Sequence, residues 1–471
     1  MSGVAITQEH QCAGCGQQMQ FDPETRGLIC RGCGTQAAPV AEEVTQSQQT
    51  DGLTCPNCGA NLPKAAGVVR QMICGFCDST FSVLQDGEDC ALLGEIPDNH
   101  KYIIPFSTSR EAYQKGMISW LAQEKGTPVD AFDEVAMIRG AEGYYIPHYI
   151  CVASYQVRWS ASIGYDRIET YTVMETTTEN GKTTTRPVTR TRVVTDWQPH
   201  SDTASGRVTN ACPANNFLEA VYTKVEATNT KDNLEGIRDS SIGRFSQHIV
   251  SVSPTSASPV GGVAYDTKYT AGFQVMSCEL PATKAYDKSF IHSQIAATIT
   301  ANAPGDHIRD LRFDGDIIPT YSLVYLPTWI SVYTYQNRVC ASHAAGTEEG
   351  FHFGTRPVDK DLKRKVKLAI LPFKITGSIA LLLLIILGIR VLWTYVIMER
   401  YLQISDMFYN VMLGFTGLAI MTGIIGGIIR AILYGRSRKA LMQQVDAHLE
   451  NPSKIFGRKS VADDPIRELT K

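Results

Sequence analysis

The sequence predicts a multidomain α+β protein that is anchored in a membrane by its C-terminal part. Two long apolar segments, residues 375–398 and 407–429, lie near the C-terminal end. Each has about the ~20 residues that a helix needs to cross a bilayer core. Paired Cys-x-x-Cys motifs near the N-terminal end are typical of zinc ribbons. Between these regions, strand-like and helix-like patterns follow one another. We therefore expect two zinc ribbons, a β-rich antiparallel domain and a transmembrane helical hairpin.

The composition is that of a globular protein with a minor membrane part. Hydrophobic residues make up 44% and charged residues 19% of the 471 residues, and this length suits about three folded units. The first twelve residues lack the basic and apolar regions of a signal peptide, so we expect a cytosolic N-terminus.

The N-terminal region contains an internal repeat of two Cys-x-x-Cys knuckles. Fourteen residues separate the knuckles in the first copy, residues 8–36, and fifteen in the second, residues 52–84. A knuckle directs both of its sulfurs at one ion, so each copy predicts one tetrahedral Zn²⁺ site. Residues 37–51 have the composition of a flexible linker, which favours two independent sites over an interleaved pairing. The predicted ligands are Cys12, Cys15, Cys30 and Cys33 in the first site and Cys55, Cys58, Cys74 and Cys77 in the second.

Both zinc ions are expected to be structural, because a module of this size cannot bury a useful core without metal. Iron in a rubredoxin-like redox site is the alternative, since four thiolates also bind iron. Nucleic-acid binding is disfavoured by charge. Residues 1–100 contain four Lys and Arg against twelve Asp and Glu, whereas phosphate binding needs a basic surface.

Residues 91–360 are expected to form a β-rich α+β domain of two related halves, residues 100–212 and 280–355. The segments YYIPHY at 144–149 and VYLPTW at 324–329 share aromatic residues around a central proline. Each follows a predicted helix and opens a strand. This likeness is the basis for proposing two halves.

Several elements of this domain follow from local patterns. Thr108 and Glu111 have the spacing of a capping box, which predicts a helix of about fifteen residues. A second helix is predicted over residues 284–301, and strands over residues 309–313 and 321–335. Residues 213–250 give no clear pattern.

A β-hairpin is predicted around Asn180-Gly181, where threonine-rich segments flank a turn signal. Pro187 places the returning strand at a sheet edge. That strand is rich in Lys and Arg, and we expect a solvated, charge-protected edge, with a basic binding ribbon as the alternative.

Residues 370–430 predict the membrane hairpin, followed by a cytosolic tail over residues 431–471. Lys and Arg near helix ends stay on the cytoplasmic side, so both termini are expected in the cytosol at the cytoplasmic (inner) membrane. Arg390 lies within the first span and is expected to snorkel outward, with an intramembrane ion site as the alternative. Gly423 and Gly427 are expected to pack the two spans together. The flanking cations are Lys363, Arg364, Lys365, Lys367, Lys374, Arg430, Arg436, Arg438 and Lys439.

No motif for catalysis is found, so we expect a protein that is not an enzyme and has no catalytic residues. His148 is expected at a strand edge. A third metal site at Cys340, His343 and His352 is weighed against irregular spacing, and surface histidines are preferred. The remaining cysteines, Cys90, Cys151, Cys212 and Cys278, are expected to be separate buried thiols.

Paired knuckles, Ile104-Pro105-Phe106, YYIPHY and YLPTW together resemble bacterial membrane-associated TFIIB-type zinc-ribbon proteins over residues 55–360. Some members carry a helicase-like label, but no phosphate-binding GxxxxGK[ST] loop occurs here. The resemblance implies a scaffold that recruits phage-shock protein A-like or SPFH (flotillin-like) proteins to the membrane. A membrane-tethered nucleic-acid-binding or transcription-related protein is the second hypothesis.

Overall fold

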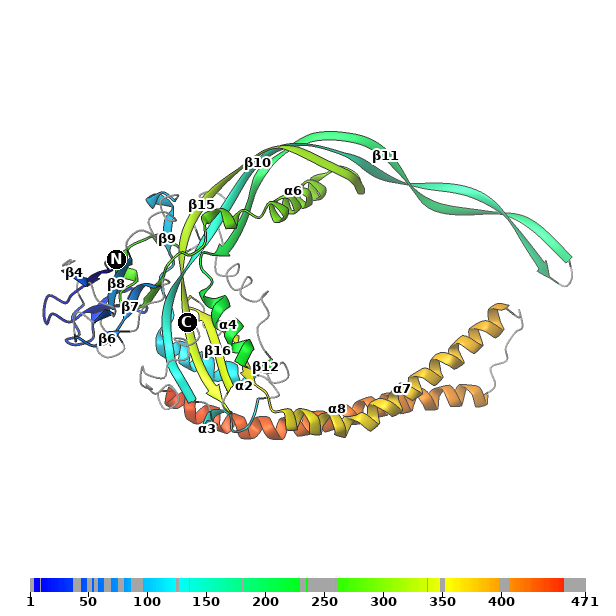
Figure 1. The fold of residues 1–471 in the computed structure, drawn as a ribbon. Helices are drawn as coiled ribbons and strands as arrows, with labels where there is room; N and C mark the ends of the chain where they lie inside the picture. Colours follow the sequence, from blue (N-terminus) through cyan, green and yellow to red (C-terminus); the bar gives the residue numbers. More distant parts are fainter. Residues whose placement is uncertain are drawn as a thin grey trace.

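The computed structural model shows a mixed α+β protein with one large β-sheet and two long apolar helices at the C-terminal end (Figure 1). The sheet continues from the central domain into the N-terminal region. The structure describes residues 4–8, 10–36, 44–48, 53–54, 58–62, 69–74, 80–85, 96–123, 127–134, 136–179, 182–228, 234–235, 259, 261–336, 338–347, 352–397 and 406–452.

Three long strands form the centre of the sheet: β10 (Ala136–Glu179), β11 (Lys182–Pro213) and β15 (His307–Tyr335). β10 pairs antiparallel with both of the others. β15 is one strand where two were predicted, because Gly315 and Pro319 stay in the ladder, opposite Val157 and Ala153 of β10. Among the described strands, β11 pairs only with β10, so the predicted sheet edge at Pro187 is confirmed.

The two proline-centred segments pair with one another. Ile146 lies opposite Leu326, and each central proline lies opposite a tyrosine or its neighbour on the other strand: Tyr145 faces Pro327, and Pro147 faces Tyr325. A short parallel strand flanks each segment, β14 (Gln274–Met276) beside β10 and β9 (Lys101–Ile103) beside β15. The proposed division into two halves stays a prediction, but both motifs meet at one point of the sheet.

Helix α2 (Arg110–Gln123) begins one residue later than the capping box predicts. The Ser109 hydroxyl accepts the Ala112 amide at 3.3 Å and caps the helix. The Thr108 hydroxyl instead donates to the Gly346 carbonyl at 2.9 Å and accepts the Trp329 indole N–H at 3.0 Å. These buried tertiary bonds take the hydroxyl away from the cap, which a local pattern cannot reveal.

Helix α6 (Lys288–Asn302) is confirmed within the predicted range and begins later. Asp287 caps it by accepting the Phe290 amide at 3.0 Å, and a 3₁₀ turn, Ala282–Ala285, occupies the residues before it. Its buried side chains, Ile291, Ile295 and Ile299, pack on the sheet at helical spacing.

An aromatic cluster forms the main core between α2 and the sheet. Phe106 stacks on Phe273 with ring centroids 4.1 Å apart, and it contacts Tyr145 and Trp329 at 5.1 and 4.9 Å. All four side chains are buried. The IPF segment that precedes α2 therefore joins the two proline-centred motifs in one core.

The N-terminal strands join the same sheet. β1 (Val4–Gln8) pairs with β4 (Val44–Gln48) on one side and β8 (Thr80–Gln85) on the other. β7 (Val69–Ile73) pairs with β8 and with β14 of the central domain. The prediction of a flexible linker between independent repeats is therefore wrong at residues 44–48, because that segment finds strand partners far away in the sequence.

The helices α7 (Lys360–Ile397) and α8 (Asp406–Glu450) form a long antiparallel hairpin that extends from the body (Figure 1). The inner end of α8 packs against the body through the buried Leu441 and Val445. The predicted tail helix is thus the end of α8. Connection residues 398–405 lie outside the described residues.

Gly423 and Gly427 do not pack the two helices together. A Cβ added at either position would meet no atom within 4 Å, whereas one at Gly377 would lie 2.9 Å from the Thr422 hydroxyl. Gly426 approaches Phe373 at 3.6 Å. The close approach of α7 and α8 therefore uses Gly377, and the prediction for Gly423 and Gly427 is wrong.

The remaining elements are shorter and complete the sheet and its cover. They are β2 (Met19–Asp22), β3 (Gly27–Cys30), β5 (Leu53–Thr54), β6 (Asn61–Leu62), β12 (Leu234–Glu235), β13 (Val263–Ala264), β16 (Arg338–Ala345), β17 (His352–Gly354), β18 (Arg356–Pro357), α3 (Ala131–Glu134), α4 (Phe217–Thr228) and the 3₁₀ turns Asp98–His100 and Thr267–Tyr269.

Candidate metal centre

The first pair of knuckles is held by the β2–β3 hairpin. Both knuckles end in the same turn, in which the Gly16 amide donates to the Cys12 carbonyl and the Gly34 amide to the Cys30 carbonyl, each at 2.8 Å. Gly16 and Gly34 have φ values of 72° and 74°. Only glycine adopts this conformation without strain, so the glycine after each knuckle has a structural reason.

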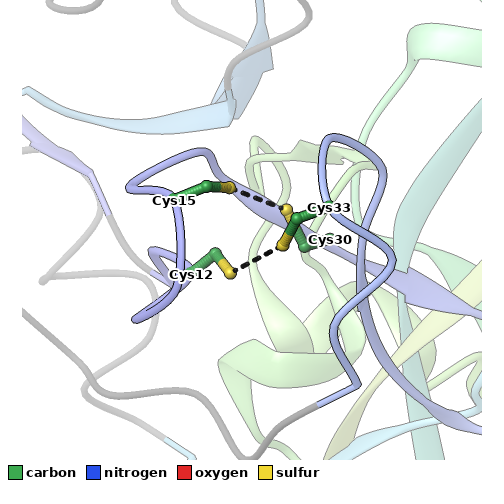
Figure 2. Close-up of side chains that lie close together, drawn as sticks. All are labelled: Cys12, Cys15, Cys30 and Cys33. Carbon is green, nitrogen blue, oxygen red and sulfur yellow. Dashed lines mark hydrogen bonds between the residues drawn. The ribbon is translucent and has the colours of Figure 1, made fainter.

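The four sulfurs of this module converge, as Figure 2 shows. All lie within 4.8 Å of one another. The sulfurs of Cys12 and Cys33 are 3.6 Å apart, and those of Cys15 and Cys30 are 3.4 Å apart. Four thiolates about 2.3 Å from a tetrahedral ion would be roughly 3.8 Å apart, whereas a disulfide would bring two sulfurs to about 2.05 Å. Cys12, Cys15, Cys30 and Cys33 therefore lie close enough to bind one metal ion.

The protonation of these thiols indicates that a cation belongs between them. The hydroxyl of Thr35, 2.9 Å from the Cys33 sulfur, and the Thr35 amide lower the pKa of Cys33 to about 6. The amides of Gly14 and Cys15 lower the pKa of Cys12. The Gln17 amide also acts to lower the pKa of Cys15, but the neighbouring sulfurs, Cys30 first, and desolvation raise it to about 12. Four sulfurs this close cannot all ionise unless a positive charge compensates them.

Thr35 is a functional residue that the sequence interpretation missed. Its position two residues after the last cysteine of the knuckle is the signal that could have identified it. The sequence did predict the four ligands and their grouping, and the structure brings them together without interleaving the two repeats.

The arrangement suits a closed structural site. Cys12 and Cys30 are buried, while Cys15 and Cys33 lie at the surface. In the part of the chain that the structure describes, the cluster of possible metal ligands contains these four cysteines and no histidine or carboxylate. Four protein sulfurs fill a tetrahedral ion and leave no position for a substrate. Four thiolates suit zinc or iron, so the geometry leaves the identity of the metal open.

The second predicted site is described in part. The sulfurs of Cys58 and Cys74 are 3.7 Å apart, and Gly59 repeats the positive φ of the first module at 70°. Cys55 and Cys77 lie outside the described residues. The second metal site therefore stays a prediction, supported by one sulfur pair at the spacing expected for two ligands of one ion.

The histidines that were weighed as ligands lie in the core. His343 stacks on Phe353 with centroids 5.4 Å apart, and His352 lies 5.1 Å from the Tyr113 ring. Both His343 and Cys340 are buried, so the preference for surface histidines is wrong at position 343. No third metal cluster is found among the described residues.

His148 is also fully buried and does not lie at a strand edge. It stands on β10 between β11 and β15, opposite Pro213 and Val324. Its Nδ1 lies 3.1 Å from the Ile146 carbonyl. The sequence suggested an edge because the polar side chain was read locally, without the strand that pairs on each side.

Three of the remaining cysteines are neighbours and do not stand alone. Cys212 lies opposite Tyr149 on the paired strand, two residues from Cys151, and Cys278 interacts with Tyr149. Burial raises the pKa of Cys151 and of Cys212 to about 11. They are thus protonated, unreactive thiols, while Cys90 lies outside the described residues.

Comparison of the chain with family models, with curated proteins and with solved structures gives no significant match. The function of the protein is therefore inferred from its own residues.

Proposed function

We propose that this protein is a membrane-anchored zinc-ribbon scaffold that displays its cytosolic domains for protein–protein interaction. The observation that carries the proposal is the exposure of the apolar side chains on α7 and α8. Both helices are long and apolar enough to cross a membrane. Ile379, Leu382 and Ile389 are between 53% and 61% exposed, and so are Leu413, Ile420 and Met421 on α8 at 56% to 59%.

A buried helix of a soluble protein is the other common reason for such an apolar sequence. Core helices bury these residues, and soluble proteins rarely expose apolar patches larger than a few hundred Å². Two exposed apolar helices, side by side, are therefore best accounted for by a hydrocarbon environment. Basic residues gather where the hairpin approaches the body, from Lys363 to Lys374 and from Arg430 to Lys439, which supports a cytosolic body.

The metal in this proposal is zinc, with two ions per chain. The closed set of four sulfurs at the first site supports a structural ion, whose binding energy supplies folding energy to a small module. Because β1 joins the first knuckle region to β8 and β7 joins the second to β14, both modules are positioned by the central sheet. The metal modules thus form a firm projection of the cytosolic body.

The partners of the scaffold are proposed to be proteins, with phage-shock protein A-like or SPFH proteins implied by the family resemblance. The acidic N-terminal region supports protein contacts over nucleic-acid contacts, since twelve acidic residues in residues 1–100 would repel phosphate. Membrane maintenance or stress response is the corresponding role.

The test is recovery of partners from native membranes. The tagged full chain is crosslinked in cells, solubilised in mild detergent and isolated, and co-purifying proteins are identified and counted against the chain. Defined partners at a reproducible ratio are expected, and they should be lost from a Cys30→Ser/Cys33→Ser chain that still resides in the membrane. Recovery of the chain alone, or of the same partners with the double variant, would refute a scaffold that acts through its metal modules.

A further inference from the structure

Beyond the edge of β15, the strands β10 and β11 continue as a two-stranded ribbon that extends far from the body (Figure 1). β15 last pairs at Gly164, so residues 165–179 and 182–196 pair only with one another among the described strands. An isolated two-stranded hairpin is marginally stable in water and usually gains stability by packing a face. The ribbon therefore calls for a surface that covers it.

The two faces of this ribbon differ in charge. One face, the charged face, carries residues that pair internally. Arg167 contacts Asp196 at 2.7 Å, Arg192 contacts Glu169 at 2.7 Å, and Arg190 pairs with Glu175. These long side chains half-bury the valines beneath them, Val173, Val188 and Val194. The charged face is thus satisfied within one chain, which also weakens the alternative of a basic binding ribbon.

The other face, the threonine face, has no charge and no cover. It consists of five cross-strand pairs whose ten side chains are all exposed. Ile168 and Val193 are 74% and 65% exposed, and Met174 is 63% exposed. In order, the pairs are Ile168–Val193, Thr170–Thr191, Thr172–Thr189, Met174–Pro187 and Thr176–Thr185.

The order of the first four pairs is palindromic: apolar, threonine, threonine, apolar. If two copies pack their threonine faces in opposite directions, the Ile168–Val193 pair of one copy meets the Met174–Pro187 pair of the other. The two threonine pairs then meet each other, where hydroxyls can hydrogen-bond. A twofold contact requires such a self-complementary patch, and the lack of charge means that like charges do not oppose each other across it.

The size of the face is sufficient for such a contact. Fifteen residues per strand span about 50 Å at ~3.3 Å per residue, and two strands are about 10 Å wide. Two faces of this size bury about 1,000 Å² together, which is the lower bound of specific interfaces. We propose that the β10–β11 ribbon is a homodimerisation arm that packs its threonine face against the same face of a second copy of this chain.

The test places a photo-crosslinking amino acid on each face of the full chain in lipid nanodiscs. At Met174, on the threonine face, it should join two copies. At Tyr171, on the charged face and also exposed, it should give at most a tenth of that yield. The dimerisation arm is overturned if the Met174 probe captures only lipid or solvent, or if both positions crosslink two copies equally.

A matched pair of charge variants gives an independent measurement. Thr189→Glu puts a carboxylate on the threonine face, where two copies would oppose like charges, and should weaken dimerisation at least tenfold by mass photometry. Val188→Glu puts the same side chain on the charged face near Arg190 and should leave dimerisation within twofold of wild type. Equal dimerisation of wild type and Thr189→Glu, or equal loss in both variants, would contradict the proposal.

Discussion

At the scale of single residues, the chemistry of the chain is concentrated in sulfurs that lie closer together than four anions tolerate. The Thr35 hydroxyl and neighbouring amides stabilise thiolates at Cys33 and Cys12, while the adjacent sulfurs keep Cys15 protonated. This division of charge is what an ion at the centre would remove. The residues fit a metal site for a chemical reason as well as a geometric one.

Replacing Cys30 by serine should therefore remove one metal ion per chain. Cys30 is fully buried at the end of β3, so the change also leaves a poor ligand at the centre of the module. Elemental analysis of purified protein should fall from about two zinc ions to about one. Cys212→Ser, which changes a thiol outside the knuckles, is the control, and an unchanged metal content in Cys30→Ser would contradict the site.

Buried histidines predict a pH dependence of stability. Burial lowers the pKa of His148 to about 4 and of His343 to about 3, from an ordinary value of 6.5. Between these values the unfolded chain binds protons that the folded chain does not. The free energy of unfolding should thus be highest above pH 6.5 and should fall as the pH decreases toward 4, by about 3 kcal/mol for His148.

His148→Thr tests this dependence, because Thr328 occupies the matching position of the second proline-centred segment. Thr328 also contacts the carbonyl two residues before it, Leu326, at 3.5 Å. The variant should show a flatter pH profile of unfolding than wild type between pH 6.5 and 4. Both proteins carry the same cysteines, so metal release cancels in the comparison, and parallel profiles would refute a role for His148.

At the scale of elements, periodic helices were predictable and strand partners were not. α2 and α6 follow from apolar residues at helical spacing, although their first residues depend on Ser109 and Asp287, whose hydrogen bonds are tertiary or local choices. The pairing of Tyr145 with Pro327 joins residues that lie far apart in the chain. No local pattern specifies such a register, so the sequence could identify both motifs but not their contact.

The helical hairpin gives a prediction at this scale. Gly377→Ile should push α7 from α8, because its Cβ would lie 2.9 Å from the Thr422 hydroxyl. The midpoint of thermal unfolding in detergent should fall by several degrees, as overpacking costs about 1–3 kcal/mol. Gly427→Ile, where a Cβ meets nothing within 4 Å, is the control and should change the midpoint little. Equal effects would mean that the two helices do not meet at Gly377.

At the scale of the whole molecule, one sheet connects the metal modules to the membrane-directed part. β7 and β14 join the N-terminal region to the centre, and the buried Leu441 and Val445 of α8 join the hairpin to the same body. The sequence suggested separate units because the knuckles, the strands and the apolar segments each have their own pattern. The strand at residues 44–48 shows why that inference failed, since its partners lie outside its own module.

Much of the candidate site could be predicted, because Cys-x-x-Cys spacing is a direct consequence of metal geometry. The structure brings the first four cysteines together and places Cys58 beside Cys74. The hydrogen bond from Thr35 and the grouping of Cys151, Cys212 and Cys278 could not be predicted, since both depend on the path of the folded chain. Zinc and iron were not separable, because four thiolates bind either ion.

The central claim, that α7 and α8 lie in a bilayer, is tested most directly by alkaline carbonate extraction of membranes that contain the full chain. Integral helices resist this treatment, whereas proteins held by surface contacts are released. We predict that the full chain stays in the membrane pellet and that a chain ending before Lys360 moves to the supernatant. Release of the intact full chain into the supernatant would contradict the account.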